Sequence, residues 1–319
     1  MALRLLIIGA NGQLGHALST HAKPALFSCL ESVMTTDKTK LDLTKPDQIT
    51  NLLKDYRPHV VINAAAYTEV DAAEEHSELA KAVNATAVGV LAEVTKKIDA
   101  VLVHFSTDYV FDGQKTSPYV ETDTPEPLSV YGRTKLEGEQ FLSQVGGKWV
   151  CFRTGWVYGP KGNHFCKKIL NLAKTRDQLQ IVNDQRGAPT PTGWLAELGL
   201  VIPGILAKSK YVTRQNPAPT FLPDYPQELP VGEIFHASAA GETTWYEYAN
   251  FAIDAALEHK LLTQKPQLEP VQTSAMSFKA QRPLYSVLDT TKLMNTFKIS
   301  PPAWEKGVKN WIISLDTLD

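Results

Sequence analysis

The chain contains few cysteines and no long apolar run, and each absence excludes a class of protein. Its 319 residues include three cysteines, Cys29, Cys151 and Cys166, an odd number without metal-ligand spacing. We therefore expect free thiols in a reducing, cytoplasmic environment rather than a disulfide framework. No run reaches the roughly 18 apolar residues of a membrane helix, and the apolar segment near the start is too short for a secretory signal. We expect no membrane association.

Neither the charge nor the histidine pattern points to nucleic acid or to a metal. The formal net charge is −2, and the sequence has no basic stripe and no acidic tail, which argues against a nucleic acid partner. The eight histidines form none of the spaced ligand pairs of zinc enzymes. With 43% hydrophobic residues, the chain can bury one large core or two smaller ones.

A glycine-rich turn directly behind a short apolar segment is the first feature with chemical meaning. Residues 5–8 predict a buried parallel strand. In a turn of this kind, glycines permit a tight bend and a close approach to a pyrophosphate, and the following helix amino terminus attracts phosphate. The pattern predicts a dinucleotide site, with a plain strand-to-helix turn as the alternative. The candidate cofactor-binding residues of this turn are Gly9, Gly12, Gln13, Leu14 and Gly15.

Two acidic residues further along bear on the choice of cofactor. Asp37 follows a second predicted strand, 32–36, and lies 22 residues past the last glycine of the turn (37 − 15), where a carboxylate accepts the adenosine ribose hydroxyls. Lys38 follows, and a cation there tolerates a 2′-phosphate, so NADH and NADPH both stay open. Asp42 and Leu43 suit the adenine amino group and ring, although a turn role for Asp42 is an equal alternative.

The first half of the chain alternates strand-like and helix-like segments. Further strands are predicted at 59–63, 100–105 and 149–153, and an Ala- and Glu-rich stretch over 70–97 predicts helix with one break. This alternation predicts an α/β fold with a Rossmann-type, doubly wound parallel sheet. Ligands of such sheets bind beyond the carboxyl ends of the strands. Small and polar residues that leave room for a cofactor follow the third strand, although a tight helix–sheet contact explains them equally: Ala64, Ala65, Ala66, Tyr67 and Thr68.

The second half is less regular and predicts a smaller α/β substrate-binding domain. A strand is expected at 235–238, a helix from Thr244 through Ala256 and a last helix at 303–315. Residues 208–230 are rich in proline and polar residues and predict a long loop or insertion. The predicted division assigns residues 1–157 and about 187–210 to the dinucleotide-binding domain, and about 158–186 and 211–319 to the substrate-binding domain.

A tyrosine and a lysine four residues apart suggest the chemistry. Tyr131 and Lys135 share one face of a predicted helix capped by Ser129, and Thr107 follows a strand end. An ordinary phenol, with a pKa of about 10, holds its proton too tightly for acid–base work near neutral pH, and a nearby ammonium lowers that pKa. We expect Tyr131 to act as the acid–base group. Lys135 would tune it and hold the nicotinamide ribose, and Thr107 would hydrogen-bond the reacting oxygen. An ordinary exposed helix pair is the alternative.

Seven segments together resemble the dTDP-4-dehydrorhamnose reductase family of the extended short-chain dehydrogenase/reductase superfamily. The resemblance covers nearly the whole chain and implies NAD(P)H-dependent reduction of the C4 ketone of dTDP-4-dehydro-L-rhamnose, in dTDP-L-rhamnose biosynthesis. It implies that Tyr131 supplies the proton and that Asp108 and Trp156 contact the dTDP-sugar. The segments are 9–15, 63–71, 106–113, 131–135, 153–158, 182–190 and 282–283. The residues that the resemblance places along the cofactor are Gly12, Gln13, Leu14, Asp37, Asp42, Leu43, Ala66, Tyr67, Thr68 and Phe105.

Further candidates for substrate contacts are Trp156, Asn183 and Arg282. An arginine can pair with a diphosphate through a bidentate hydrogen bond, and a surface arginine before a proline is the alternative. Related 4,6-dehydratases carry a glutamate where this chain has Tyr109, which argues against dehydration. Some family members bind Mg²⁺ at a dimer interface through glutamates, but Ala17 and its neighbours offer no such carboxylate. A homodimer therefore stays open, without an evident metal ligand.

Two other functions compete with this hypothesis. The regulatory subunit of methionine adenosyltransferase shares the expected fold and binds a dinucleotide without a firmly assigned reaction. A reductase or epimerase of another nucleotide sugar is the second alternative. Copurification with a synthetase would distinguish the first, and tightly bound oxidised cofactor would distinguish an epimerase.

Overall fold

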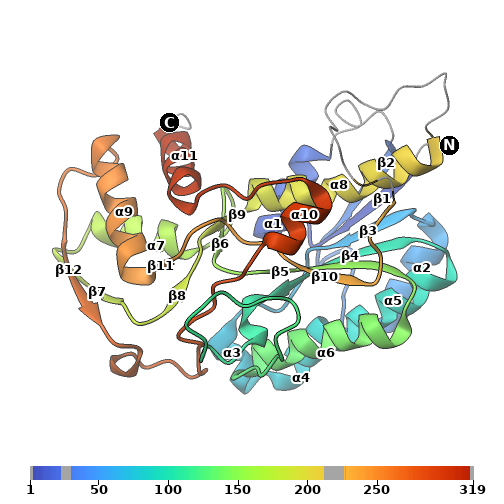
Figure 1. Ribbon diagram of the computed structural model, residues 1–319, viewed down its shortest axis with the longest axis horizontal. Coiled ribbons are helices and arrows are strands. Elements are labelled where there is room, and N and C mark those ends of the chain that lie inside the picture. The colour runs from blue at the N-terminus through green and yellow to red at the C-terminus, as the bar shows by residue number, and fades with distance from the viewer. Residues whose placement is uncertain (1–2, 23–29, 212–225, 227, 317–319) are drawn as a thin grey trace.

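The computed structural model describes residues 3–22, 30–211, 226 and 228–316, and it has two lobes (Figure 1). The larger lobe is built on a six-stranded sheet in the order β10-β5-β4-β3-β1-β2. Every neighbouring pair in this sheet is parallel. Its strands are β1 (Leu3–Ile8), β2 (Leu30–Thr36), β3 (Val60–Asn63), β4 (Val101–Thr107), β5 (Lys148–Thr154) and β10 (Glu233–His236).

Helices cover both faces of the sheet. Alternate residues of β1 point to opposite faces: Leu5 and Ile7 enter one core, and Leu6 and Ile8 the other. The first core includes α1 (Gln13–His21), α8 (Thr192–Tyr211) and α10 (Thr291–Phe297). The second includes α2 (Pro46–Tyr56), α5 (Ala87–Lys97) and α6 (Val130–Val145). The remaining elements of this lobe are α3 (Val70–Glu75), α4 (Ser77–Lys81), the π-helical turn η1 (Ala82–Thr86) and the 3₁₀ turn η2 (Asp108–Val110).

The smaller lobe has an aromatic core of its own. Tyr158, Tyr248, Trp304 and Trp311 are buried there among α7, α9 and α11. Its sheets are two-stranded: β7 pairs with β12, β8 with β11 and β6 with β9. The elements are β6 (Val157–Tyr158), α7 (Phe165–Ala173), β7 (Gln178–Val182), β8 (Arg186–Gly187), β9 (Thr190–Pro191), β11 (Thr243–Thr244), α9 (Trp245–Glu258), β12 (Gln267–Val271), η3 (Thr273–Ala275) and α11 (Trp304–Asp316).

The sequence patterns predicted most of these elements correctly. The α/β class, the doubly wound parallel sheet, the interrupted helix over 70–97 and the Ser129 cap of α6 are all confirmed. One part of the predicted domain division is wrong, because β10 is an edge strand of the large sheet and α10 packs against its core. Residues 208–211 belong to α8 rather than to a loop, and 212–225 and 227 of the expected insertion lie outside the described residues.

Within the described ranges, no helix is long and apolar enough to cross a membrane.

A buried ion pair joins α6 to β5. Arg153 and Glu139 are each 2% exposed, and the guanidinium makes hydrogen bonds of 2.7, 3.0 and 3.2 Å to the carboxylate. The guanidinium carbon also lies 5.1 Å from the centre of the Phe111 ring. Removing one charge from a pair this deeply buried leaves the other without compensation.

We predict that Arg153→Met lowers the free energy of unfolding by about 3–5 kcal/mol, because Glu139 would remain buried without its cation. Urea unfolding measures this loss. The double variant Glu139→Leu/Arg153→Met removes both charges and is expected to recover most of the stability. If the double variant were as unstable as the single one, lost packing rather than the unpaired charge would explain the effect.

Candidate active site

The glycine turn lies at the carboxyl end of β1, next to the point where the strand order reverses. Gly9 has a φ of +87°, which glycine adopts without strain, and the amides of Gly9 and Ala10 donate to the Thr36 carbonyl at 2.9 and 2.8 Å. A β-carbon at Gly15 would overlap the Gly9 carbonyl oxygen, so α1 packs directly on the turn. Gly12 is the N-cap of α1, and no side chain makes a capping hydrogen bond there. The first amides of a helix have no partner within the helix, so this helix end suits a pyrophosphate.

The residues predicted to hold the adenosine end follow β2. The Asp37 carboxylate accepts hydrogen bonds from the Asn11 amide at 2.6 Å and from the Thr39 hydroxyl and amide. The bonds from Thr39 lower the pKa of Asp37, so the carboxylate is charged at neutral pH. Asp42 stabilises a turn, as the alternative interpretation expected. Its Oδ1 accepts hydrogen bonds from the amide and the hydroxyl of Thr44, and neither of these bonds uses Oδ2. Leu43 is buried.

The small-residue segment after β3 is held rigidly against the sheet. The Ala64 amide donates to the Ile8 carbonyl at 3.0 Å. Further along, the Tyr67 amide donates to the Asn84 side chain, whose amide group donates back to the Tyr67 carbonyl. Asn84 lies in the π-helical turn η1. The backbone of 64–67 is thus fixed beside the glycine turn, where the prediction placed a cofactor.

Thr107 and Tyr131 meet at the carboxyl end of β4. Thr107 is the last residue of that strand, and Tyr131 lies in the first turn of α6, which the Ser129 hydroxyl caps by accepting from the Gly132 amide at 3.2 Å. The surrounding protein desolvates the half-buried Tyr131 phenol and raises its pKa to about 12, and a hydrogen bond with Thr107 opposes that rise. The Tyr109 ring packs edge-on at 5.9 Å.

The buried Lys135 side chain contacts His104 and a backbone carbonyl of β4. Its Nζ donates to the Phe105 carbonyl at 2.6 Å and lies 3.3 Å from Nε2 of His104. Burial lowers the pKa of Lys135 to about 8. The pKa of Tyr131 lies above its ordinary value, contrary to the expectation that the ammonium lowers it, because desolvation of the phenol outweighs every favourable contact.

Asp108 is a buried carboxyl group next to this pair. It is 3% exposed, and the Thr107 hydroxyl donates to it at 3.1 Å. Burial raises the pKa of Asp108 to about 6, although hydrogen bonds from Ser286 and Thr107 act in the opposite direction. The carboxyl group therefore changes charge near neutral pH.

Trp156 forms a flat aromatic surface at the junction of the lobes. Its backbone has a φ of +50°, which is unusual for a residue with a bulky side chain, and its ring stacks on Trp245 at 3.5 Å between centroids. The Trp245 indole nitrogen donates to the Gln185 side chain at 3.0 Å. The stack fixes the orientation of the indole.

Asn183 and Arg282 are both engaged by protein partners. Asn183 accepts a 2.7 Å hydrogen bond from the hydroxyl of Thr244, the N-cap of α9. Arg282 makes two hydrogen bonds to Asp71 of α3, at 3.0 and 2.8 Å, and lies 3.8 Å from the centre of the Phe278 ring. Their contact with substrate stays a prediction, and a diphosphate at Arg282 would compete with Asp71.

Three residues at the site escaped the sequence interpretation. His104 contacts Lys135, Trp245 stacks on Trp156, and Ser286 opposes the rise in the pKa of Asp108. His104 carried a signal, because it is a polar residue inside an otherwise apolar strand segment, 101–105. Trp245 and Ser286 are distant in sequence from the residues they contact, and no local pattern identifies such pairs.

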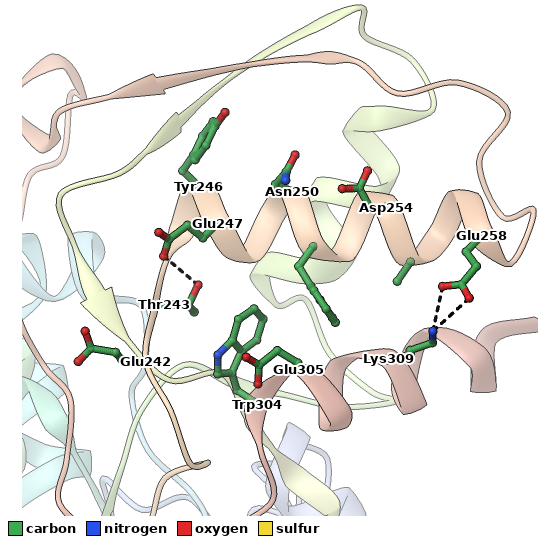
Figure 2. A pocket seen from close by; sticks show the side chains of 12 residues that line it. Glu242, Thr243, Tyr246, Glu247, Asn250, Asp254, Glu258, Trp304, Glu305 and Lys309 are labelled. Atoms are coloured by element: carbon green, nitrogen blue, oxygen red, sulfur yellow. Dashed lines mark hydrogen bonds and ion pairs between the residues drawn. The ribbon is translucent and has the colours of Figure 1, made fainter.

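Two cavities of the structure do not include Thr107, Tyr131 or Lys135. One cavity, of about 600 Å³, lies between α9 and α11 and is lined by five acidic residues (Figure 2). At its end Lys309 is ion-paired with Glu258. None of the predicted site residues lines it. A second cavity, of about 490 Å³, includes Arg282 and Asp184. Across the part of the chain that the structure describes, no three His, Cys, Asp or Glu side chains gather to hold a metal ion.

We predict that Asp108→Asn stabilises the protein at neutral pH. The folded-state pKa of Asp108 is raised, so the wild type loses stability as pH rises from about 4 to about 6 and the carboxyl group ionises in its buried site. Above that range the variant should be about 2–3 kcal/mol more stable in urea unfolding, and at acidic pH the two should agree. Asp55→Asn, at an exposed site on α2, is the control. A gain independent of pH would show that titration of Asp108 is not the cause.

Comparison with known proteins agrees with this geometry. The RmlD substrate binding domain family matches residues 3–317. The dTDP-4-dehydrorhamnose reductase of Burkholderia thailandensis is 38% identical, covering 96% of this chain and 97% of its own. The enzyme of Escherichia coli K12 is 36% identical, covering 99% of each chain.

A solved structure extends the likeness to three dimensions. The crystal structure of dTDP-4-dehydrorhamnose reductase from Bacillus anthracis in complex with NADP is 33% identical, with a TM-score of 0.82 over 98% of this chain and 100% of that chain. The UDP-glucose 4-epimerase of Thermus thermophilus, 19% identical with a TM-score of 0.75 over 99% of this chain and 100% of that chain, shares the fold. The glycine turn, the Thr107–Tyr131 pair and these matches together show that the chain belongs to the dTDP-4-dehydrorhamnose reductase family.

Proposed function

We propose that this protein is an NAD(P)H-dependent oxidoreductase that reduces the C4 ketone of dTDP-4-dehydro-L-rhamnose to give dTDP-L-rhamnose. The observation that carries the proposal is the meeting of Thr107 and Tyr131 at the carboxyl end of β4. Thr107 ends a strand of the sheet whose β1 end forms the glycine turn, and Tyr131 lies on α6. Relatives at 36–38% identity over nearly the full length are reductases of this name.

The cofactor site follows from the turn and the strand ends. The free amides at the amino terminus of α1 would hold the pyrophosphate, and Asp37 would accept the adenosine ribose hydroxyls. The small residues 64–66 leave the backbone accessible beside β3. When bound there, the reduced nicotinamide supplies the hydride.

Tyr131 is positioned to supply the proton. A phenol whose pKa is raised keeps its proton until a stronger base, the alkoxide formed at C4, takes it. The Thr107 hydroxyl, whose hydrogen is donated to Asp108 in this structure, would turn that hydrogen to the same oxygen and favour its negative charge. The Trp156–Trp245 stack would bound the sugar-nucleotide side.

We expect Tyr131→Phe to lower kcat by about 100-fold or more, because the alkoxide would lose its proton donor, while the Kd for NADPH changes little. Loss of NADPH absorbance with dTDP-4-dehydro-L-rhamnose measures the rate, and dinucleotide titration measures binding. Tyr246→Phe, on α9 outside the site, is the matched control.

Two outcomes would contradict parts of this proposal. Wild-type kcat in Tyr131→Phe would exclude the phenol as proton donor. Failure of the wild-type protein to oxidise either NADPH or NADH, despite measurable dinucleotide binding, would contradict the reductase and favour a regulatory dinucleotide-binding subunit.

Asp37→Ala tests the adenosine end of the site. The substitution removes a charged acceptor for the ribose hydroxyls, so the KM for NADH should rise about tenfold or more. The KM for NADPH, whose 2′-phosphate cannot donate to Asp37, should rise far less. Steady-state kinetics with both cofactors measure the ratio, with Asp55→Ala on α2 as control. Equal increases for both cofactors would place Asp37 outside the ribose contact.

A further inference from the structure

A buried polar pair lies behind the catalytic lysine, and the reduction described above does not use it. Asn63 ends β3 and His104 lies on β4, opposite it in the strand register. Both are 1% exposed, as is Lys135. Buried polar side chains cost free energy unless each donor meets an acceptor, so the direction of every hydrogen bond here has consequences.

The direction of the hydrogen bonds through Asn63 and His104 is set by a backbone amide, which can only donate. The Ala65 N–H donates to Asn63 Oδ1 at 3.2 Å. The amide nitrogen of Asn63 therefore faces His104 Nδ1, 3.2 Å away, and donates to it. Burial and the nearby Lys135 hold the pKa of His104 well below its usual value, so the ring is neutral. A neutral imidazole whose Nδ1 accepts carries its hydrogen on Nε2.

That hydrogen points at Lys135. His104 Nε2 lies 3.3 Å from Lys135 Nζ, and the Phe105 carbonyl accepts from Nζ at 2.6 Å. An Nε2–H cannot accept a hydrogen bond from an ammonium, but it can donate to the lone pair of a neutral amine. A chain of hydrogen bonds therefore runs from the Ala65 amide through Asn63 and His104 to Lys135. Each donor in it meets an acceptor when Lys135 is uncharged.

We propose that His104, oriented by Asn63, is a positioning residue that donates its Nε2–H to Lys135 and makes the lysine a reversible proton carrier within the working pH range. The catalytic consequence rests on the proposed reductase function, whereas the hydrogen-bond direction does not. The ammonium form favours loss of the proton from Tyr131, and the neutral form is the one that the His104 bond stabilises.

Other charged and titratable groups around Lys135 favour its ammonium form, whereas the hydrogen bond from His104 favours the neutral amine. Cys151 on β5 and Glu139 on α6 raise the pKa of Lys135, and burial outweighs them, giving a value of about 8. Glu139 is ion-paired with Arg153, which reduces its effect. Because the pKa of Lys135 is lowered, the ammonium is present below about pH 8 and is lost as pH rises above it, so the reduction should slow on that alkaline limb.

The direction of the chain is measured directly by nitrogen NMR of the full-length protein labelled with ¹⁵N-histidine. The His104 signals are those lost in His104→Gln. We expect an unprotonated Nδ1 and a protonated Nε2 at neutral pH, without substrate or cofactor. A protonated Nδ1, or an imidazolium ring, would overturn the proposal. This measurement needs no activity, so it stands whether or not the reductase function holds.

The substitution Asn63→Asp is expected to reverse the direction of the hydrogen bonds at His104. A carboxylate still accepts from the Ala65 amide, but it also accepts from His104, so the ring hydrogen moves to Nδ1 and Nε2 accepts from the Lys135 ammonium. We expect the inverted tautomer by NMR and an alkaline limb of kcat displaced upward by about one pH unit or more. In His104→Gln the side chain can accept from Asn63 and donate to Lys135, so the limb should stay in place. An inverted tautomer with an unmoved limb in Asn63→Asp would refute the role of His104 in setting the charge of Lys135.

Discussion

The parallel run of all six strands is the constraint on which the rest of the structure depends. Because β1 to β5 and β10 point the same way, every strand delivers its last residue to one edge of the sheet. The strand order reverses between β1 and β3, because β2 lies on one side of β1 and β3 on the other. The helices that follow these strands diverge at this point. The glycine turn, the 64–68 segment and Thr107 all lie at this edge, although long helical segments separate them in sequence.

The site retains several ionisable groups that the fold would be more stable without. Asp108, Tyr131 and Lys135 all have pKa values displaced by burial towards the uncharged form. Such displacement is typical of sites where protons move. The Arg153–Glu139 pair, equally buried, is satisfied by its own charges and joins α6 to β5. Buried groups without an opposite charge beside them are therefore suited to changing charge, whereas the Arg153–Glu139 pair holds α6 in place.

Local patterns predicted the strands, the broken helix over 70–97 and the cap at Ser129, because each depends on neighbours within a few residues. They also placed Tyr131 and Lys135 on one helix and Thr107 at a strand end, as the structure has them, since strand ends and helical spacing are local features. The edge strand β10 was assigned to the wrong domain because its pairing with β5 joins residues about 80 positions apart (233 − 150 = 83). Arg282 was a candidate for contact with a diphosphate, and its partner Asp71 lies 211 residues away.

The sequence by itself determined the kind of protein: a strand, a glycine turn and a helix for a dinucleotide, and a tyrosine and lysine on one helical face. Those features are set by backbone conformation and by spacing along the chain. Only the tertiary structure decided the charge states, because desolvation depends on which residues from distant elements surround a group. It also decided the direction of the chain from Ala65 through Asn63 and His104 to Lys135, because a hydrogen bond has a direction only when both partners are in place.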